Sequence, residues 1–290
     1  MWYLLAILLF FATILLLSLT MIHLGFRVPE NLEKTDPGRM GLAYQTVSIP
    51  TVSHKRLFGW LLPVPGTTAT LVILHGWGGN AEQMLPMALP FHRAGMNVLL
   101  VDARSHGRSD KDTFSSLPRF AEDMEQAIEW LKRTYPEYCR KIALLGHSVG
   151  GGAVLFAASR RSDIDAVISV SAFAHPKWMM ERFLKRAHVP GFLVPFVIRY
   201  VEWVIGYRYE VFAPVNTICH IKCPVLLVHG KADRTVPVED ALTIMKRCKR
   251  SNIRLLTVEG AGHESVEKIK THEKELVQFL RDSGLPIGSV

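Results

Sequence analysis

The segment Gly146-His147-Ser148-Val149-Gly150 follows the pattern G-x-S-x-G. The apolar run before it, 141–145, is typical of a buried strand, and the small residues after it suit a helix that starts close against a sheet. In that setting the glycines permit a backbone bend too tight for a side chain, and the serine hydroxyl is pushed out at the carboxyl edge of the sheet. The sequence therefore predicts a nucleophile elbow with Ser148 as the nucleophile.

A serine hydroxyl is a poor nucleophile near neutral pH. It needs a base to take its proton, and the base needs an acid to hold its tautomer. After a nucleophile elbow these partners follow as acid and then histidine, on loops that leave later strands. Asp233 and His263 stand on two such loops, so we predict a catalytic triad of Ser148, Asp233 and His263. Glu259 and Glu264 flank the histidine and remain rival acids.

Acyl transfer also needs an oxyanion hole, in which two backbone N–H groups point to the developing negative charge. Val149, directly after the nucleophile, is predicted to supply one. Trp77 is predicted to supply the other, because it lies in the glycine-rich loop 75–79 (His-Gly-Trp-Gly-Gly) after a strand-like run. A glycine-rich turn without a special role is the alternative. A phosphate-binding loop is less favoured, since no G-K-[ST] follows.

Two other groups of polar residues invite a chemical interpretation. The charged turn 102–109 leaves a strand-like run, and we interpret it as structural, with Asp102 holding loop amides beside the elbow. Cys219, His220 and Cys223 are close in sequence, but a metal site would need a second ligand pair. No metal and no cofactor are predicted. The four cysteines of the chain are compatible with a reducing compartment.

The elements that must position these residues alternate between strand and helix patterns. Most strand-like runs are continuously apolar, as expected for a parallel sheet with helices on both faces. They are 44–49, 57–62, 70–74, 97–101, 141–145, 166–170, 224–228 and 253–258. Helical patterns cover 118–134, 238–249 and 264–281. The predicted fold class is α/β, in one domain over residues 44–290.

Residues 174–213 interrupt this alternation. They are too long for one crossover helix, and they mix aromatic and aliphatic residues with basic ones. We interpret them as a helical lid inserted over the active site. An ordinary pair of core helices is the alternative.

The N-terminal residues 2–24 contain no Asp, Glu, Lys or Arg. Because about 20 apolar residues span a bilayer as a helix, residues 1–26 are predicted to form a transmembrane anchor, followed by a linker over 27–43. A cleaved signal peptide is less favoured, since no basic residue precedes the run and no A-x-A-like site follows it. Arg27, Lys34 and Arg39 come after the run, which favours a catalytic domain on the cytoplasmic side of the membrane.

The 290-residue chain carries a net charge of +8. It contains no nucleic-acid-binding motif, so nucleic acid is not an expected partner. Attraction to an anionic lipid surface and a plain solvated surface are both compatible with this charge.

Together these motifs resemble the α/β-hydrolase superfamily over residues 44–282. The resemblance rests on H-G-x-G-G at 75–79, D-x-R-x-x-G-x-S at 102–109, G-H-S-x-G at 146–150, H-G-x-x-D-x-x-V-P at 229–237 and G-x-G-H at 260–263. Within the superfamily the chain is similar to membrane-anchored serine esterases and to the serine-aminopeptidase-like and monoacylglycerol-lipase-like branch. Branches with an aspartate nucleophile do not fit Ser148.

The resemblance and the triad imply a serine hydrolase that acts on carboxylic esters. The apolar lid favours lipid-like esters. A peptidase or an acyltransferase on the same triad remains an alternative, and a non-catalytic membrane-binding protein is a more distant one. The sequence leaves the oligomeric state open.

Overall fold

The computed structural model describes residues 2–25, 27–248 and 251–288. Strands are β1 (Gln45–Pro50), β2 (Arg56–Leu62), β3 (Ala69–Leu74), β4 (Asn97–Val101), β5 (Lys141–His147), β6 (Ala166–Val170), β7 (Val225–Gly230) and β8 (Ile253–Val258). Helices are α1 (Trp2–Gly25), α2 (Leu85–Arg93), α3 (Leu117–Thr134), α4 (Val149–Ser159), α5 (Pro176–Arg186), α6 (Val194–Ile205), α7 (Tyr209–Phe212), α8 (Pro214–Thr217), α9 (Val238–Arg247), α10 (Val266–Lys270) and α11 (Glu273–Asp282). Each predicted strand is present, with ends that agree within two residues.

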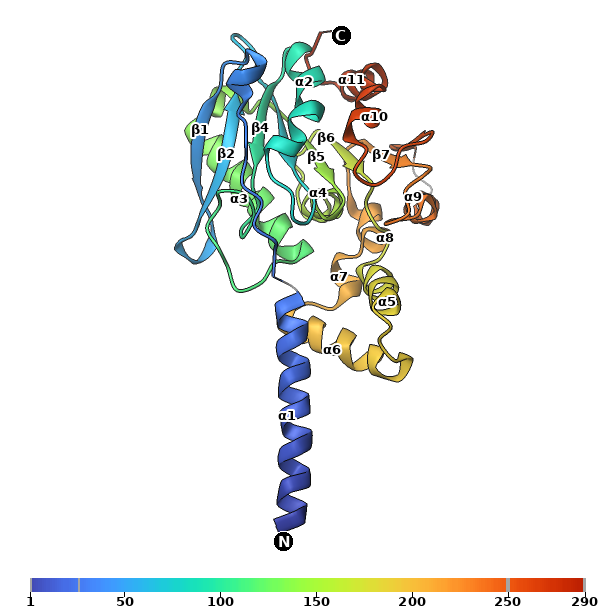
Figure 1. Ribbon diagram of the computed structural model, residues 1–290. Coiled ribbons are helices and arrows are strands. Elements are labelled where there is room, and N and C mark those ends of the chain that lie inside the picture. Colours follow the sequence, from blue (N-terminus) through green and yellow to red (C-terminus); the bar gives the residue numbers. More distant parts are fainter. Residues whose placement is uncertain (1, 26, 249–250, 289–290) are drawn as a thin grey trace.

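The strands form one sheet in the order β1-β2-β4-β3-β5-β6-β7-β8. The β1–β2 and β2–β4 pairs are antiparallel, and the remaining neighbours are parallel. The predicted fold class, a mostly parallel sheet flanked by helices, is therefore confirmed (Figure 1).

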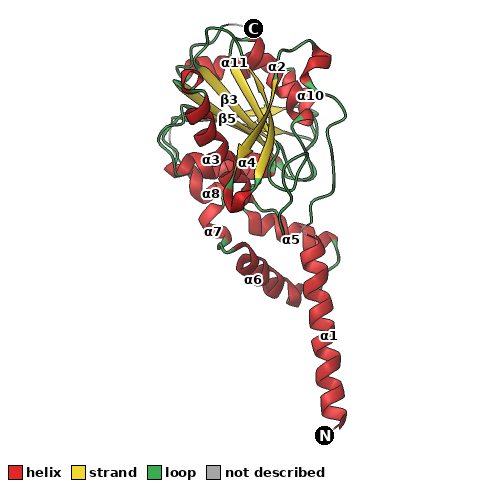
Figure 2. Ribbon diagram, turned by 90° about the vertical axis from the view of Figure 1, so that its left-hand side faces the viewer, coloured by secondary structure: helices red, strands yellow, loops and turns green. Residues whose placement is uncertain are grey.

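Alternation along the strands divides the interior into two cores. Successive side chains of a strand point to opposite faces of the sheet. In β3, Val72 and Leu74 face a core that includes residues of α3, α4 and α9. Leu71 and Ile73 face a second core, with α2 and α11. The continuously apolar strands follow from this arrangement, because both faces are covered, as Figure 2 shows for α3 and α11.

The segment between β6 and β7 is helical and contains α5 to α8. Arg182 of α5 forms a bidentate ion pair with Asp240 of α9, with N–O distances of 3.1 and 2.8 Å. Phe192 and Phe196 are 74% and 73% exposed. These two side chains are therefore exposed, whereas Ile198 and Val201 of α6 are buried in the core.

The N-terminal helix α1 projects away from the domain, and its last turn approaches α6 (Figure 1). Residues 1 and 26 lie outside the described residues, as do the side chains at positions 4, 11, 12, 14, 15, 17 and 18. A membrane span takes about 20 consecutive apolar residues, and among the described residues no helix is long and apolar enough to cross a membrane. This finding contradicts the predicted transmembrane anchor over residues 1–26. The membrane localisation, with a domain on the cytoplasmic side, rested on that anchor and is corrected with it.

Candidate active site

The nucleophile elbow lies between the end of β5 and the start of α4. Ser148 has φ 54° and ψ −116°, a conformation that side chains rarely adopt. Its N–H donates to the carbonyl of Val170 at 2.8 Å. A Cβ at Gly146 would lie 2.1 Å from the oxygen of Gly150, and one at Gly150 would lie 2.3 Å from the oxygen of His75. The bend therefore accepts only glycine at both positions of the motif.

Three predicted site residues meet at the carboxyl edge of the sheet. His263 Nε2 lies 2.9 Å from Ser148 Oγ, and His263 Nδ1 lies 2.7 Å from Asp233 Oδ2. The serine follows β5, the aspartate follows β7 and the histidine follows β8. With its proton on Nδ1, the imidazole donates to the carboxylate, and its Nε2 can accept the serine proton. This is the arrangement that proton transfer from the hydroxyl requires.

The surroundings of Asp233 keep its carboxylate charged. Its Oδ1 accepts the N–H groups of Thr235 and Val236 at 2.9 and 2.8 Å. Burial alone would raise the pKa of Asp233, but hydrogen bonds from His263 and Val236 outweigh this effect and hold the pKa below its ordinary value. The ionised carboxylate can accept a hydrogen bond from Nδ1 of His263 and so orient the ring.

The two rival acids, Glu259 and Glu264, have exposed side chains. Glu259 pairs with Lys231. In the described part of the chain neither carboxylate contacts the imidazole of His263, whereas Asp233 does.

The two predicted oxyanion-hole residues flank the nucleophile. Val149 is the first residue of α4, and Trp77 lies on the loop after β3. This loop comes close to the elbow, since a Cβ at Gly76 would lie 3.2 Å from the Cβ of Ser148. Within the described residues, the backbone N–H groups of Trp77 and Val149 have no hydrogen-bond acceptor. Both groups are therefore available to a developing oxyanion.

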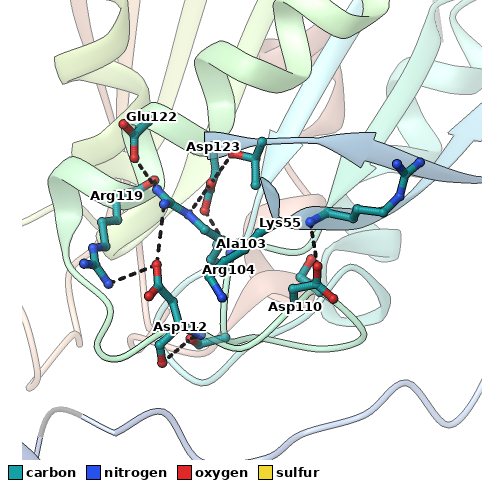
Figure 3. A network of polar contacts seen from close by, with 12 residues as sticks. Lys55, Ala103, Arg104, Asp110, Asp112, Arg119, Glu122 and Asp123 are labelled. Carbon is teal, nitrogen blue, oxygen red and sulfur yellow. Dashed lines mark hydrogen bonds and ion pairs between the residues drawn. The ribbon is translucent and has the colours of Figure 1, made fainter. Parts of the chain in front are cut away.

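The turn 102–109 is structural, as predicted from the sequence. Asp102 accepts the N–H groups of Ala81 at 2.6 Å and Arg108 at 2.9 Å. The buried guanidinium of Arg104 binds Asp123 of α3 at 2.7 Å and also pairs with Glu122 (Figure 3). The turn thus connects the glycine-rich loop to α3.

His147 has no role that the sequence predicts. Its buried Nε2 lies 2.9 Å from the carbonyl oxygen of His263, so a proton on Nε2 donates to the loop that carries the base. Burial lowers the pKa of His147, which keeps the ring neutral in this position. The sequence shows only that a histidine precedes the nucleophile, because the contact joins loops more than 100 residues apart.

In the ranges that the structure describes, no group of three His, Cys, Asp or Glu residues is arranged to hold a metal ion.

Comparisons with known proteins agree with this fold. Residues 65–205 match the serine aminopeptidase S33 family, and residues 209–289 match the TAP-like protein family. YqkD of Bacillus subtilis is 27% identical over 264 residues, which cover 89% of this chain and 83% of that protein. The α/β-hydrolase domain-containing protein aho-3 of Caenorhabditis elegans is 27% identical over 75% of this chain and 59% of its own length.

Among solved structures, the esterase Pf2001 of Pyrococcus furiosus superimposes with a TM-score of 0.72 and 26% identity, over 88% of this chain and 96% of the esterase. Est1E of Butyrivibrio proteoclasticus, solved with ferulic acid, has a TM-score of 0.62 at 22% identity and covers 80% of this chain and 98% of its own. These matches support a hydrolase activity. The sheet order and the family matches over residues 65–205 and 209–289 show that the chain belongs to the α/β-hydrolase superfamily.

Proposed function

We propose that the chain is a serine hydrolase that cleaves carboxylic esters through an acyl-enzyme intermediate. The observation that carries this proposal is the continuous chain of hydrogen bonds from Asp233 through His263 to Ser148. The strained elbow and the adjacent free amides add to it. The esterase neighbours favour an ester over other hydrolysable bonds.

In the proposed mechanism, the oxygen of Ser148 attacks the acyl carbon while His263 Nε2 takes the serine proton. The carbonyl oxygen becomes an oxyanion between the N–H groups of Trp77 and Val149. When the C–O bond to the alcohol breaks, the imidazolium returns its proton to the leaving oxygen. A water molecule, deprotonated by the same histidine, then attacks the acyl-enzyme and releases the acid. Asp233 stabilises the imidazolium in both steps.

Lipid-like acyl esters are the proposed substrate class. The lid insertion, residues 174–213, follows the carboxyl end of β6 and presents exposed apolar side chains. They include Phe183, Phe192, Phe196 and Trp203. Exposed apolar patches of this kind are typical of surfaces that bind apolar ligands.

The test is Ser148→Ala with a fluorophosphonate probe, which reacts covalently with an activated serine. We expect the wild-type protein to be labelled and to hydrolyse p-nitrophenyl acetate. The alanine variant should lose both, because removal of a triad nucleophile costs roughly 10⁶-fold in turnover. Ser171→Ala is a matched control, since this buried serine also has a positive φ, and in the described part of the chain no hydrogen bond joins it to His263. Full labelling of Ser148→Ala would contradict the proposal.

The match to the serine aminopeptidase family favours one second candidate, a peptidase on the same triad. A panel of p-nitrophenyl esters of increasing acyl length, measured beside aminoacyl p-nitroanilides, separates the two. We expect kcat/KM to be higher for the esters, and preference for the anilides would favour the peptidase.

A further inference from the structure

A short N-terminal segment, residues 31–35, lies along the glycine-rich loop that carries Trp77. We call this segment the strap, and we call residues 76–82 the oxyanion loop. The strap is separated from β1 by a 3₁₀ helix at Pro37–Met40 and contributes no strand to the sheet. The strap contacts the oxyanion loop and the turn 102–109.

Asn31 and Asn80 form a reciprocal pair of contacts. The Nδ2 group of Asn31 donates to the carbonyl of Gly78 at 2.9 Å. In return, the Nδ2 group of Asn80 donates to the carbonyl of Asn31 at 3.0 Å. The first bond engages the residue directly after Trp77.

Glu82 joins the far end of the oxyanion loop to the strap. Its carboxylate accepts the N–H of Lys34 at 2.6 Å and the hydroxyl of Thr35 at 2.9 Å. Partial burial alone would raise the pKa of Glu82, but these hydrogen bonds lower it below the ordinary value. The carboxylate is thus bound in its charged form.

Glu33 anchors the middle of the strap. It is buried, and its Oε2 pairs with Arg108 at 3.1 Å. Gly107 lies against both Glu33 and Asp102, since a Cβ there would be 2.5 Å from Glu33 Oε1 and 1.9 Å from Asp102 Oδ2. The other oxygen of Asp102 accepts the N–H of Ala81 in the oxyanion loop. The strap and the turn 102–109 therefore both form hydrogen bonds to the oxyanion loop.

We propose that the strap is a positioning segment of the oxyanion hole, which holds residues 78–82 so that the Trp77 N–H points at the oxyanion. This inference rests on the proposed function. A loop with glycine at 76, 78 and 79 has large conformational freedom of its own, whereas an oxyanion donor is effective only when it is preorganised. The hydrogen bonds of Asn31 and Glu82 restrict that freedom without touching the substrate.

The test compares Asn31→Ala with Glu30→Ala in the full chain. Glu30 is the matched control, because it precedes the strap and its carboxylate pairs with exposed Lys111 instead. We expect Asn31→Ala to lower kcat for p-nitrophenyl acetate about tenfold, part of the roughly 10²–10³-fold that a lost oxyanion donor costs. KM should change less than about twofold, since the bond acts on the transition state.

Affinity for a trifluoromethyl ketone supplies a second readout. This inhibitor adds to Ser148 and places an oxyanion in the hole, so its Ki should rise with the fall in kcat. Glu82→Ala and Glu82→Gln extend the test if Asn31→Ala does not fold. The amide oxygen of Gln retains an acceptor for the strap, so Gln should recover most of the activity that Ala loses.

The results distinguish a failure of the strap proposal from a failure of the proposed function. If Asn31→Ala and Glu82→Ala keep the kcat and the inhibitor affinity of Glu30→Ala, the strap does not position the hole. The same conclusion follows if they lose thermal stability but retain kcat. If the wild-type protein itself is neither labelled by a fluorophosphonate nor active on esters, the proposed function fails instead.

Discussion

At the scale of single residues, the site depends on which nitrogen of His263 carries the proton. Asp233 lies 2.7 Å from Nδ1 and holds the proton there, which leaves Nε2 free to accept from Ser148 at 2.9 Å. The two backbone N–H groups on Asp233 Oδ1 keep the carboxylate ionised and correctly turned. In the proposed mechanism, Asp233 therefore acts through the tautomer of His263 that it selects, in addition to its charge.

Asp233→Asn should lower kcat by about 10⁴-fold, because the amide donates a hydrogen bond to Nδ1 and favours the wrong tautomer. Glu259→Gln and Glu264→Gln serve as matched carboxylate-to-amide controls and should change kcat less than about twofold. Steady-state kinetics with a soluble ester would measure all three variants. If a glutamate variant is the more damaging one, the acid is misassigned.

At the scale of elements, α3 and α4 pack on the same face of the sheet, and ion pairs join their C-terminal ends. Asp163, in the turn after α4, pairs with Lys132 in the last turn of α3 and with Arg161 Nε at 2.9 Å. Partial burial would raise the pKa of Asp163, but Arg161 and Lys132 lower it from 3.8 to about 2. The folded state therefore favours the charged carboxylate.

Asp163→Asn should destabilise the protein at pH 7 by less than about 1 kcal/mol, since the pair is partly exposed and screened by solvent. The carboxylate contributes its stability above about pH 4, and this contribution is lost as the pH falls towards 2, through the folded pKa. The variant should therefore lose less stability than the wild type between pH 5 and pH 2. Urea unfolding at each pH measures the difference. Glu137→Gln, at an exposed position, is the control. If the unfolding free energy of Asp163→Asn falls between pH 5 and pH 2 as steeply as that of the wild type, the lowered pKa of Asp163 is contradicted.

At the scale of the whole molecule, two segments outside the sheet bear on the proposed function. The lid insertion lies between β6 and β7 and is tied to α9 through Arg182 and Asp240. The strap approaches from the N-terminal side and holds the oxyanion loop. In the proposed function, the loops at the end of the sheet supply the triad, and the lid insertion is expected to select the acyl chain.

Replacement of Phe192 and Phe196 by Ser should reduce kcat/KM for long-chain esters more than for acetate esters. A short acyl group does not need an extended apolar surface, whereas burial of each CH₂ group contributes about 0.8 kcal/mol. The ratio of the two activities is the measurement. Met245→Ser, at an exposed position of α9, controls for the loss of a surface hydrophobic residue. Equal losses on both substrates would remove the main support for lipid-like esters.

The sequence by itself determined the strands, their alternation with helices and the chain order of Ser148, Asp233 and His263. These features are local: continuous apolar runs mark strands buried on both faces, and loops at strand ends carry the polar residues. The fold then brings the ends of parallel strands to one edge. Some local features were less clear, since the pattern over 264–281 predicts one helix where the structure has α10 and α11.

The tertiary structure alone decided which contacts join distant loops. The hydrogen bond of His147 to the His263 loop and the strap on the oxyanion loop link segments about 50 to 120 residues apart, and no periodicity marks such pairs. The predicted membrane anchor was inferred from composition, and the described helices do not include a span. Composition and spacing are local properties, and they predict the strand, helix or loop that a segment forms. The position of each hydrogen-bond donor and acceptor depends on packing between elements that are far apart in the chain.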